Sequence, residues 1–185
     1  MNFFKSEWII LSLKKINEKE VLYKIFFREY GKILVKKQKK NREKNLDVWY
    51  RISCEIITYE NSKNPLPCIS NIKILSYFKT DWKTYWEIEG YLKTLAYVEK
   101  QLPEWLPHWE IYDTVQYLHT DTVFTHVSYL LIHLKILAYS WDIEVSKHET
   151  ILYKIIRFIE TKPIEEIIKL KQIPQDIETK LEKLL

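Results

Sequence analysis

Three histidines recur at a spacing of seven residues, and imidazole is a common metal ligand in proteins. They are His119, His126 and His133. Helical residues seven apart are separated by about 10.5 Å, which is too far for two rings to hold one ion. A zinc-binding pair on a helix has a spacing of four instead. We therefore interpret these histidines as polar positions beside a core-facing stripe, and we predict no metal site.

The other side chains that could act as nucleophiles, ligands or general acids form no catalytic group. Cys54 and Cys68 are separated by 13 residues, which excludes a CxxC zinc motif and allows one disulfide at most. The close carboxylate pairs are Glu87 and Glu89, Asp142 and Glu144, and Glu165 and Glu166. On a helix the members of such pairs point to different sides. We expect a protein that is not an enzyme and needs no cofactor.

Glycine is scarce, which excludes one large class of nucleotide sites. The sequence contains only Gly31 and Gly90, where average usage of about 7% would give about a dozen. Neither GxxxxGK[ST] nor GxGxxG can be formed from two distant glycines. Glycine-lined phosphate loops are therefore absent from this sequence.

Charge is distributed unevenly along the 185 residues, although the net charge is only +4. Residues 1–79 contain 17 Lys and Arg against 8 Asp and Glu, whereas residues 80–185 contain 12 against 17. A basic surface favours polyanions because binding releases their counterions. We therefore expect any nucleic-acid contact to involve residues 1–79.

The strongest functional signal is a run of six cations within nine residues. These cations are Lys36, Lys37, Lys39, Lys40, Arg42 and Lys44. A solvated loop in a lysine-rich protein would give the same run, so the neighbouring sequence matters. Trp49 and Arg51 follow on a strand face that is otherwise polar, where an aromatic ring can stack on an unpaired base. We predict that these eight residues bind nucleic acid.

Residues 1–79 show the period-two hydrophobicity of β-strands. The expected strands are residues 8–13, 21–27, 33–35, 48–58 and 69–77. Gly31 precedes the third of them, where a turn residue with positive φ is wanted. Five short strands favour a small closed barrel, because closure removes exposed sheet edges.

Residues 80–185 show a period of 3.6 instead, which indicates helices. The stripe of the first expected helix is Trp82, Tyr85, Ile88, Leu92, Leu95 and Leu102. Pro163 and Pro174 each predict the start of a short helix. The period changes near residues 78–81. The sequence thus predicts an α+β protein, with a five-stranded barrel domain at 1–79 and an α-helical domain at 80–185.

This order of parts resembles the bacterial recombination mediator family RecO. The segments 8–13 (WIILSL), 20–27 (EVLYKIFF) and 29–33 (EYGKI) look like the first three strands of that family's OB barrel with its glycine turn. The segment 129–139 (YLLIHLKILAY) looks like its central core helix. The chain departs from many members because no four-cysteine zinc module follows that helix.

The resemblance implies a protein of DNA repair and homologous recombination that is not an enzyme. RecO proteins bind single- and double-stranded DNA, anneal complementary strands and act with RecR to load the recombinase. Some members also bind the acidic C-terminal tail of single-strand-binding protein. On this chain such a contact would require a local basic pocket near Lys135 or Arg157.

Two alternatives remain at this stage. OB barrels also serve as RNA-binding modules in translation or ribosome assembly, because a fold does not fix a function. A small hydrolase or nuclease is disfavoured by the missing clusters of carboxylates, histidines and cysteines. The sequence shows neither a signal peptide nor an apolar run of 18 residues, so we expect a reduced, cytoplasmic protein without a membrane span.

Overall fold

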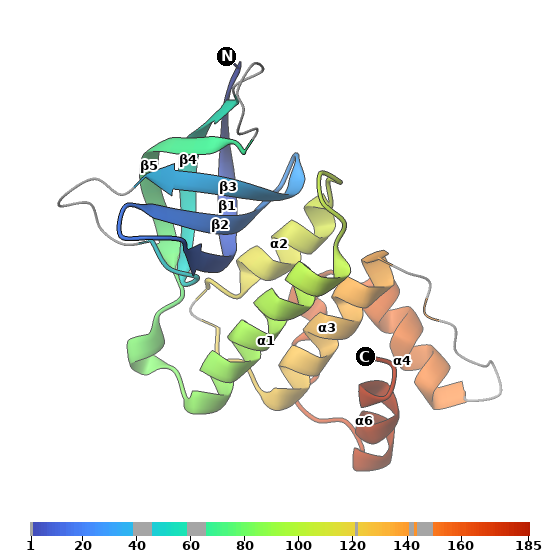
Figure 1. Ribbon diagram of the computed structural model, residues 1–185. Helices are drawn as coiled ribbons and strands as arrows, with labels where there is room; N and C mark the ends of the chain where they lie inside the picture. Colours follow the sequence, from blue (N-terminus) through green and yellow to red (C-terminus); the bar gives the residue numbers. More distant parts are fainter. Residues whose placement is uncertain (1, 39–45, 59–65, 121, 141–142, 144–149) are drawn as a thin grey trace.

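The computed structural model describes residues 2–38, 46–58, 66–120, 122–140, 143 and 150–185. Its first part is a closed barrel of five strands, β1 to β5 (Figure 1). The strands are β1 (Asn2–Lys15), β2 (Glu20–Phe27), β3 (Gly31–Gln38), β4 (Tyr50–Thr58) and β5 (Cys68–Tyr77). Their order around the barrel is β1-β2-β3-β5-β4. β3 and β5 pair in parallel and the other neighbours are antiparallel. The predicted OB-type barrel is confirmed.

The barrel interior is filled by the residues that alternate along each strand. β4 shows this most simply, since Ile52, Cys54 and Ile56 are buried while their neighbours are partly exposed. β2 has apolar residues on both faces for a different reason. Ile25 points into the barrel core, whereas Phe26 belongs to a second core that the helices share. The uninterrupted apolar run of β2 thus reflects burial on both sides.

The helical part begins almost directly after the last strand. β5 ends at Tyr77, and a short 3₁₀ turn, η1, follows at Thr80–Trp82. The α-helices are α1 (Tyr85–Gln101), α2 (Trp109–Tyr117), α3 (His126–Ser140), α4 (Thr150–Thr161), α5 (Ile164–Ile167) and α6 (Gln175–Glu182). Pro163 and Pro174 precede α5 and α6, as predicted. The change of period near residues 78–81 therefore marks the change from strands to helices.

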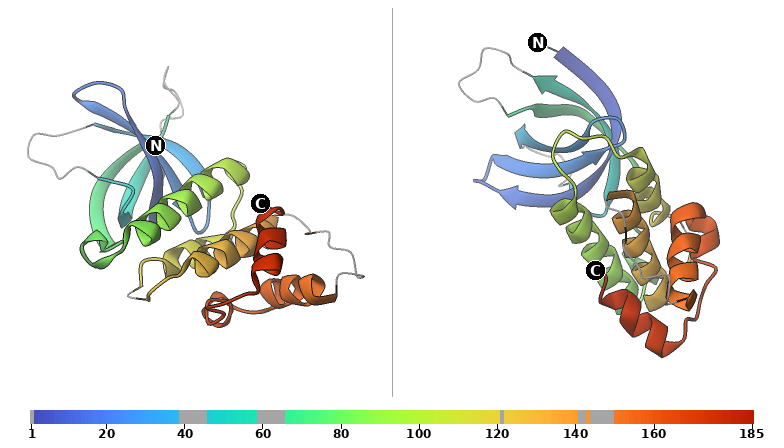
Figure 2. Two further views of the ribbon diagram at one scale, coloured as in Figure 1. Left: turned by 90° about the horizontal axis from the view of Figure 1, so that it is seen from below. Right: turned by 90° about the vertical axis from the view of Figure 1, so that its right-hand side faces the viewer.

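The helices form successive layers beneath the barrel. α1 packs between the barrel and α3, and α4 and α6 pack on the far side of α3 (Figure 2). One core is shared by the outer face of β1 and β2 and by α1, α2 and α3. Another lies between α3, α4, α5 and α6. The barrel is thus joined to the helices by a continuous apolar contact.

The buried face of α1 matches the predicted stripe only in part, since Leu95 and Leu102 are buried as predicted. Trp82 and Tyr85 are 86% and 71% exposed, and Leu92 is 40% exposed. The helix instead packs through Gly90, where a Cβ would lie 2.4 Å from the ring of Tyr129 on α3. The prediction was wrong at these positions because a small residue, not a bulky apolar one, lets the two helices approach closely.

Candidate nucleic-acid interface

The outer face of β2 and β3 is the surface on which OB barrels bind oligonucleotides, together with the β1–β2 and β4–β5 loops. Here α1 lies against one end of that face. Lys24 Nζ forms an ion pair of 2.6 Å with Glu99 of α1, and Lys32 Nζ donates to the Glu99 carbonyl oxygen at 2.6 Å. Toward the β1–β2 hairpin the same face remains partly exposed, at the cross-strand pair of Leu22 and Lys36.

A groove of about 540 Å³ opens at this end of the barrel, between the β1–β2 hairpin and the end of β3. Its lining residues are Asn17, Glu18, Lys19, Glu20 and Gln38. The hairpin is held in shape by its backbone, because Lys19 N donates to Asn17 Oδ1 at 2.8 Å and Ile16 N donates to the Glu20 carbonyl at 3.0 Å. The described lining of the groove is therefore polar, and the hairpin that forms part of it is held by its own hydrogen bonds.

One cation beside the groove already has a carboxylate partner. Lys36 Nζ lies 2.9 Å from Glu20 Oε1. The hydrogen bond to Lys36, followed by one to Asn17, lowers the pKa of Glu20, and the same contact raises the pKa of Lys36. Both groups are charged at neutral pH, so Lys36 presents a partly neutralised charge to a phosphate.

Further cations lie on the hairpin itself. Lys14, Lys15 and Lys19 are exposed. We call these three residues, together with Lys36, the basic rim. Among the described residues the rim holds four cations beside the carboxylates of Glu18 and Glu20. The sequence analysis did not include Lys14, Lys15 and Lys19. The pair Lys14 and Lys15, at the end of the first strand of a hairpin, could have indicated them.

The predicted run is only partly covered by the structure. Lys36 and Lys37 lie on β3, and Lys37 is only 7% exposed at the barrel end. Lys39, Lys40, Arg42 and Lys44 lie outside the described residues. They follow the last residue of β3, Gln38, which lines the groove. The expectation that this run contacts nucleic acid stays a prediction.

Trp49 lies in the junction between barrel and helices. Its ring stacks on Phe78 at a centroid distance of 5.9 Å and on Tyr91 of α1 at 5.6 Å. Tyr91 also donates a hydrogen bond from its hydroxyl to the Val48 carbonyl at 2.9 Å. These contacts within the protein explain the position of the Trp49 ring without a stacked nucleic-acid base. The proposed function therefore does not depend on base stacking by Trp49.

Arg51 lies close to the same junction. It pairs with Ile9 on β1, and its guanidinium is 4.0 Å from Glu7. Its Nε is buried without a hydrogen-bond partner among the described residues. Ile9 is six residues from Lys15 along β1, which corresponds to about 20 Å. The structure therefore does not bring Trp49 and Arg51 together with the hairpin side of the rim.

Two of the three histidines are polar groups within the junctions, as predicted. His119 Nε2 lies 3.1 Å from the Tyr91 hydroxyl, and His133 Nε2 lies 2.8 Å from Thr94 Oγ1. Each hydroxyl donates its own hydrogen to a backbone carbonyl, so each imidazole donates from Nε2. Burial is the main cause that lowers the pKa of both histidines to about 4.

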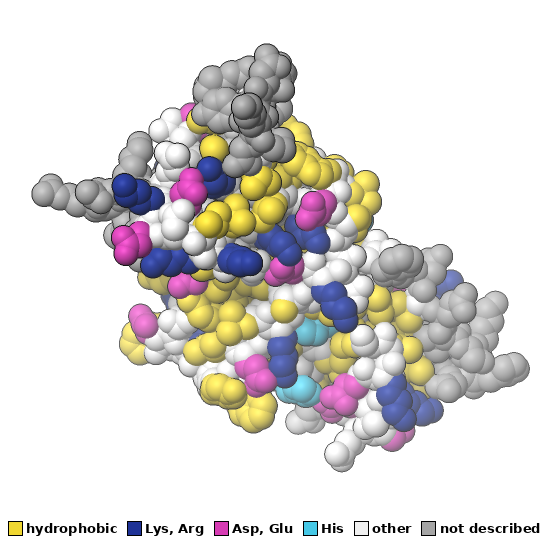
Figure 3. All heavy atoms as spheres, viewed as in Figure 1, with side chains coloured by type: hydrophobic (Ala, Val, Ile, Leu, Met, Phe, Trp, Pro, Cys, Tyr) yellow, Lys and Arg dark blue, Asp and Glu magenta, His cyan; other side chains and the backbone are white. Residues whose placement is uncertain are grey.

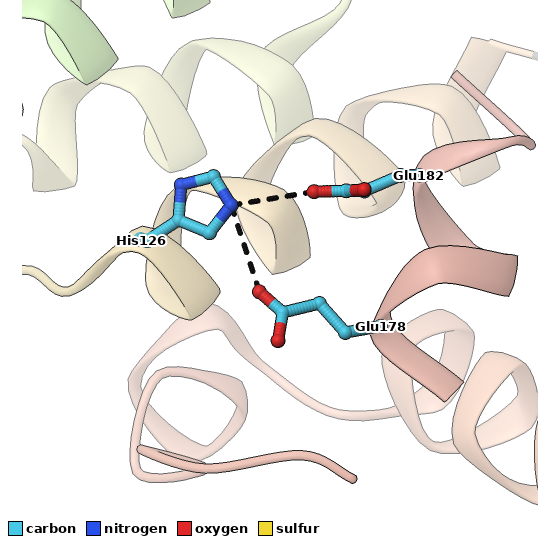
Figure 4. A group of neighbouring side chains, drawn as sticks. All are labelled: His126, Glu178 and Glu182. Carbon is cyan, nitrogen blue, oxygen red and sulfur yellow. Dashed lines mark hydrogen bonds and ion pairs between the residues drawn. The ribbon is translucent and has the colours of Figure 1, made fainter. Parts of the chain in front are cut away.

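The third histidine lies elsewhere, at the start of α3. His126 is exposed, and its Nε2 faces two carboxylates of α6 (Figure 4). The Nε2 atom is 3.5 Å from Glu178 Oε1 and 3.4 Å from Glu182 Oε1. Within the described part of the chain these three residues form a group whose ligand atoms all lie within 4.8 Å of one another.

The two thiols differ in their surroundings. Cys54 is buried inside the barrel, and burial raises the pKa of its thiol. Cys68 is partly exposed on β5, and the two residues form no disulfide. Cys54 is thus protonated at neutral pH and behaves as a small apolar core residue.

The basic pocket that a tail contact would require near Lys135 or Arg157 does not form at Lys135. That residue is 2% exposed and donates from Nζ to the Ile159 carbonyl at 2.7 Å and the Glu160 carbonyl at 2.9 Å. Its charge thus stabilises the C-terminal end of α4. Arg157 is exposed but lies 2.9 Å from the Glu160 carboxylate.

Charges of both signs are interspersed on the face of the molecule shown in Figure 3, where the barrel meets α1. Comparison with known proteins adds no assignment. No protein-family model matches the chain, and a search of curated proteins finds no match. Among the described residues no helix has both the length and the apolarity needed to cross a membrane.

Proposed function

We propose that the protein binds nucleic acid without catalysis and acts on DNA as a recombination mediator of the RecO kind. The observation that carries the proposal is the basic rim beside the groove of an OB-type barrel. This is the part of the OB surface that α1 leaves partly exposed. Phosphates would contact the lysines of the hairpin and of the run at 39–44. The nucleic-acid strand would lie along the groove.

The chemistry of the rim supports backbone contacts more than base recognition. Lysine is a compact point charge that binds phosphate without reading base edges. The described residues that line the groove are polar, and none of them is aromatic. We therefore propose binding with little sequence preference, as strand annealing requires.

A RecR-like protein remains the proposed partner, on the strength of the resemblance alone. The tail of single-strand-binding protein is a weaker proposal. An acidic tail needs accessible cations, and Lys135 is buried while Arg157 already pairs with Glu160. We place no tail contact at these two residues.

RNA is the competing ligand, since the same rim would contact ribose phosphates equally well. The test is titration of the purified chain with matched DNA and RNA oligomers, single- and double-stranded, at one salt concentration. The proposal expects single-stranded DNA to bind at least as tightly as RNA of the same sequence. It also expects the chain to accelerate annealing of complementary DNA strands. Clear preference for RNA without annealing activity would favour the RNA-binding module instead.

A further inference from the structure

The cluster of His126, Glu178 and Glu182 has the composition of a metal site. Neutral imidazole supplies a nitrogen lone pair, and two carboxylates supply oxygens and balance the charge of a divalent cation. Nitrogen ligands favour transition metals and zinc over magnesium and calcium, which prefer oxygen alone. The mixed set is therefore more selective than a group of surface carboxylates.

The distances in the cluster fit one ion. Zinc binds histidine nitrogen and carboxylate oxygen at about 2.0–2.2 Å, so two ligands of a tetrahedral site lie about 3.4 Å apart. The His126 nitrogen is 3.5 Å from the Glu178 oxygen and 3.4 Å from the Glu182 oxygen. Only the two carboxylate oxygens, which lie within 4.8 Å of each other, need to approach further.

The backbone positions of the two carboxylates are fixed by packing. Ile177 and Leu181 are buried in the core that α6 shares with α3. Glu178 and Glu182 each follow one of these anchors, and one helical turn separates them. Sites on packed helices hold their ligands more precisely than sites on loops. His126, the first residue of α3, faces both carboxylates from the other helix (Figure 4).

We propose that His126, Glu178 and Glu182 bind one divalent transition-metal ion of the zinc type, with solvent completing the coordination. The ion links the last helix, α6, to the start of α3. The proposal differs from the sequence-based expectation of no metal site, which considered only pairs of histidines and cysteines. The site is separate from the basic rim, so its role is to stabilise the docking of α6 rather than to bind nucleic acid.

The test is calorimetric titration of the chelator-treated full chain with zinc chloride, and with magnesium chloride for comparison. The proposal expects one zinc per chain and no saturable magnesium binding. Changing a group that only hydrogen-bonds to a metal ligand already costs about 10–100-fold in metal affinity. Glu178→Gln and Glu182→Gln, which change proposed ligands themselves, should therefore each weaken zinc binding by at least about tenfold. Zinc should also raise the unfolding temperature of the parent and not that of these variants.

A matched control is Glu165→Gln, which removes an exposed carboxylate from the neighbouring helix α5. It should bind zinc as the parent does. His126→Asn should behave like the two Gln variants, and circular dichroism should show all four proteins folded. Absence of zinc binding by the parent would overturn the proposal. So would binding that survives all three ligand substitutions, or that falls equally in Glu165→Gln.

Discussion

The carbonyl oxygen of Leu106 lies directly against Gly31, so that a Cβ at position 31 would come within 2.1 Å of it. Gly31 opens β3 with a φ of +73°, and Leu106 belongs to the loop between α1 and α2. Beside them Trp105 N donates to the Lys32 carbonyl at 3.0 Å. The loop between α1 and α2 thus contacts the start of β3. This contact helps to fix the position of the barrel relative to the helices.

Gly31→Ala should destabilise the protein by about 2–4 kcal/mol, because it combines left-handed backbone strain with overpacking. Urea unfolding at neutral pH measures the change. The control is Glu18→Ala in the turn of the β1–β2 hairpin, which should change stability by less than about 0.5 kcal/mol. A Gly31→Ala protein as stable as the parent would mean that the loop does not contact β3 closely.

Acid should destabilise the fold partly through His119 and His133. Burial lowers the pKa of each from 6.5 to about 4, so the unfolded chain binds the proton more readily. Their contribution is fully present above about pH 6.5 and is lost as the pH falls toward 4. His133→Gln keeps a donor for Thr94, and the pH dependence of its unfolding free energy should be shallower by on the order of 1–3 kcal/mol over this range. Equal pH profiles for parent and variant would contradict the burial of a neutral imidazole.

Lys135→Met should lower stability by about 1–3 kcal/mol, since two buried carbonyls at the end of α4 lose a charged donor. Burial lowers the pKa of Lys135, and Glu160 partly opposes that effect. Thermal unfolding measures the loss, and Lys154→Met on the exposed side of α4 is the control. The expected pattern is a lower unfolding temperature for Lys135→Met alone.

Trp49→Ala separates packing from base stacking. Because Trp49 stacks on Phe78 and Tyr91, removal of the ring should cost about 2–4 kcal/mol of stability. Affinity for single-stranded DNA, measured where the variant is fully folded, should stay within about twofold of the parent. A loss of 1–3 kcal/mol in binding with unchanged stability would restore the stacking role that the sequence suggested.

Much of the architecture could be predicted from hydrophobic period. The alternation in β4 and the positive-φ turn at Gly31 identify a barrel, and the change of period near residue 78 identifies the helices. The face of α1 could not be predicted, because the choice of Gly90 over Leu92 as a contact depends on the ring of Tyr129 on α3. Hydrophobicity alone points to the bulkier residue.

The candidate sites were less predictable than the fold. The run at 36–44 is visible as sequence, but the relation of Lys36 to Lys14, Lys15 and Lys19 depends on the pairing of β2 with both β1 and β3. The group formed by His126 with α6 depends on residues more than fifty positions apart, which no local spacing can reveal. The hydrogen bonds from Lys135 to the carbonyls at the end of α4 could not be predicted for the same reason.

The most direct test of the account is the salt dependence of binding to single-stranded DNA, because phosphate contacts determine its slope. Roughly four contacts, at about −0.7 each, predict a slope of log affinity against log salt near −3. Removing Lys39, Lys40, Arg42 and Lys44 together by alanine should flatten that slope and weaken all sequences about equally. A control variant with alanine at Lys154, Lys169 and Lys171, which are exposed lysines of the part of the chain after the barrel, should keep the slope of the parent. A variant with these four alanines that stays folded and binds with the parent's affinity and slope would contradict the account.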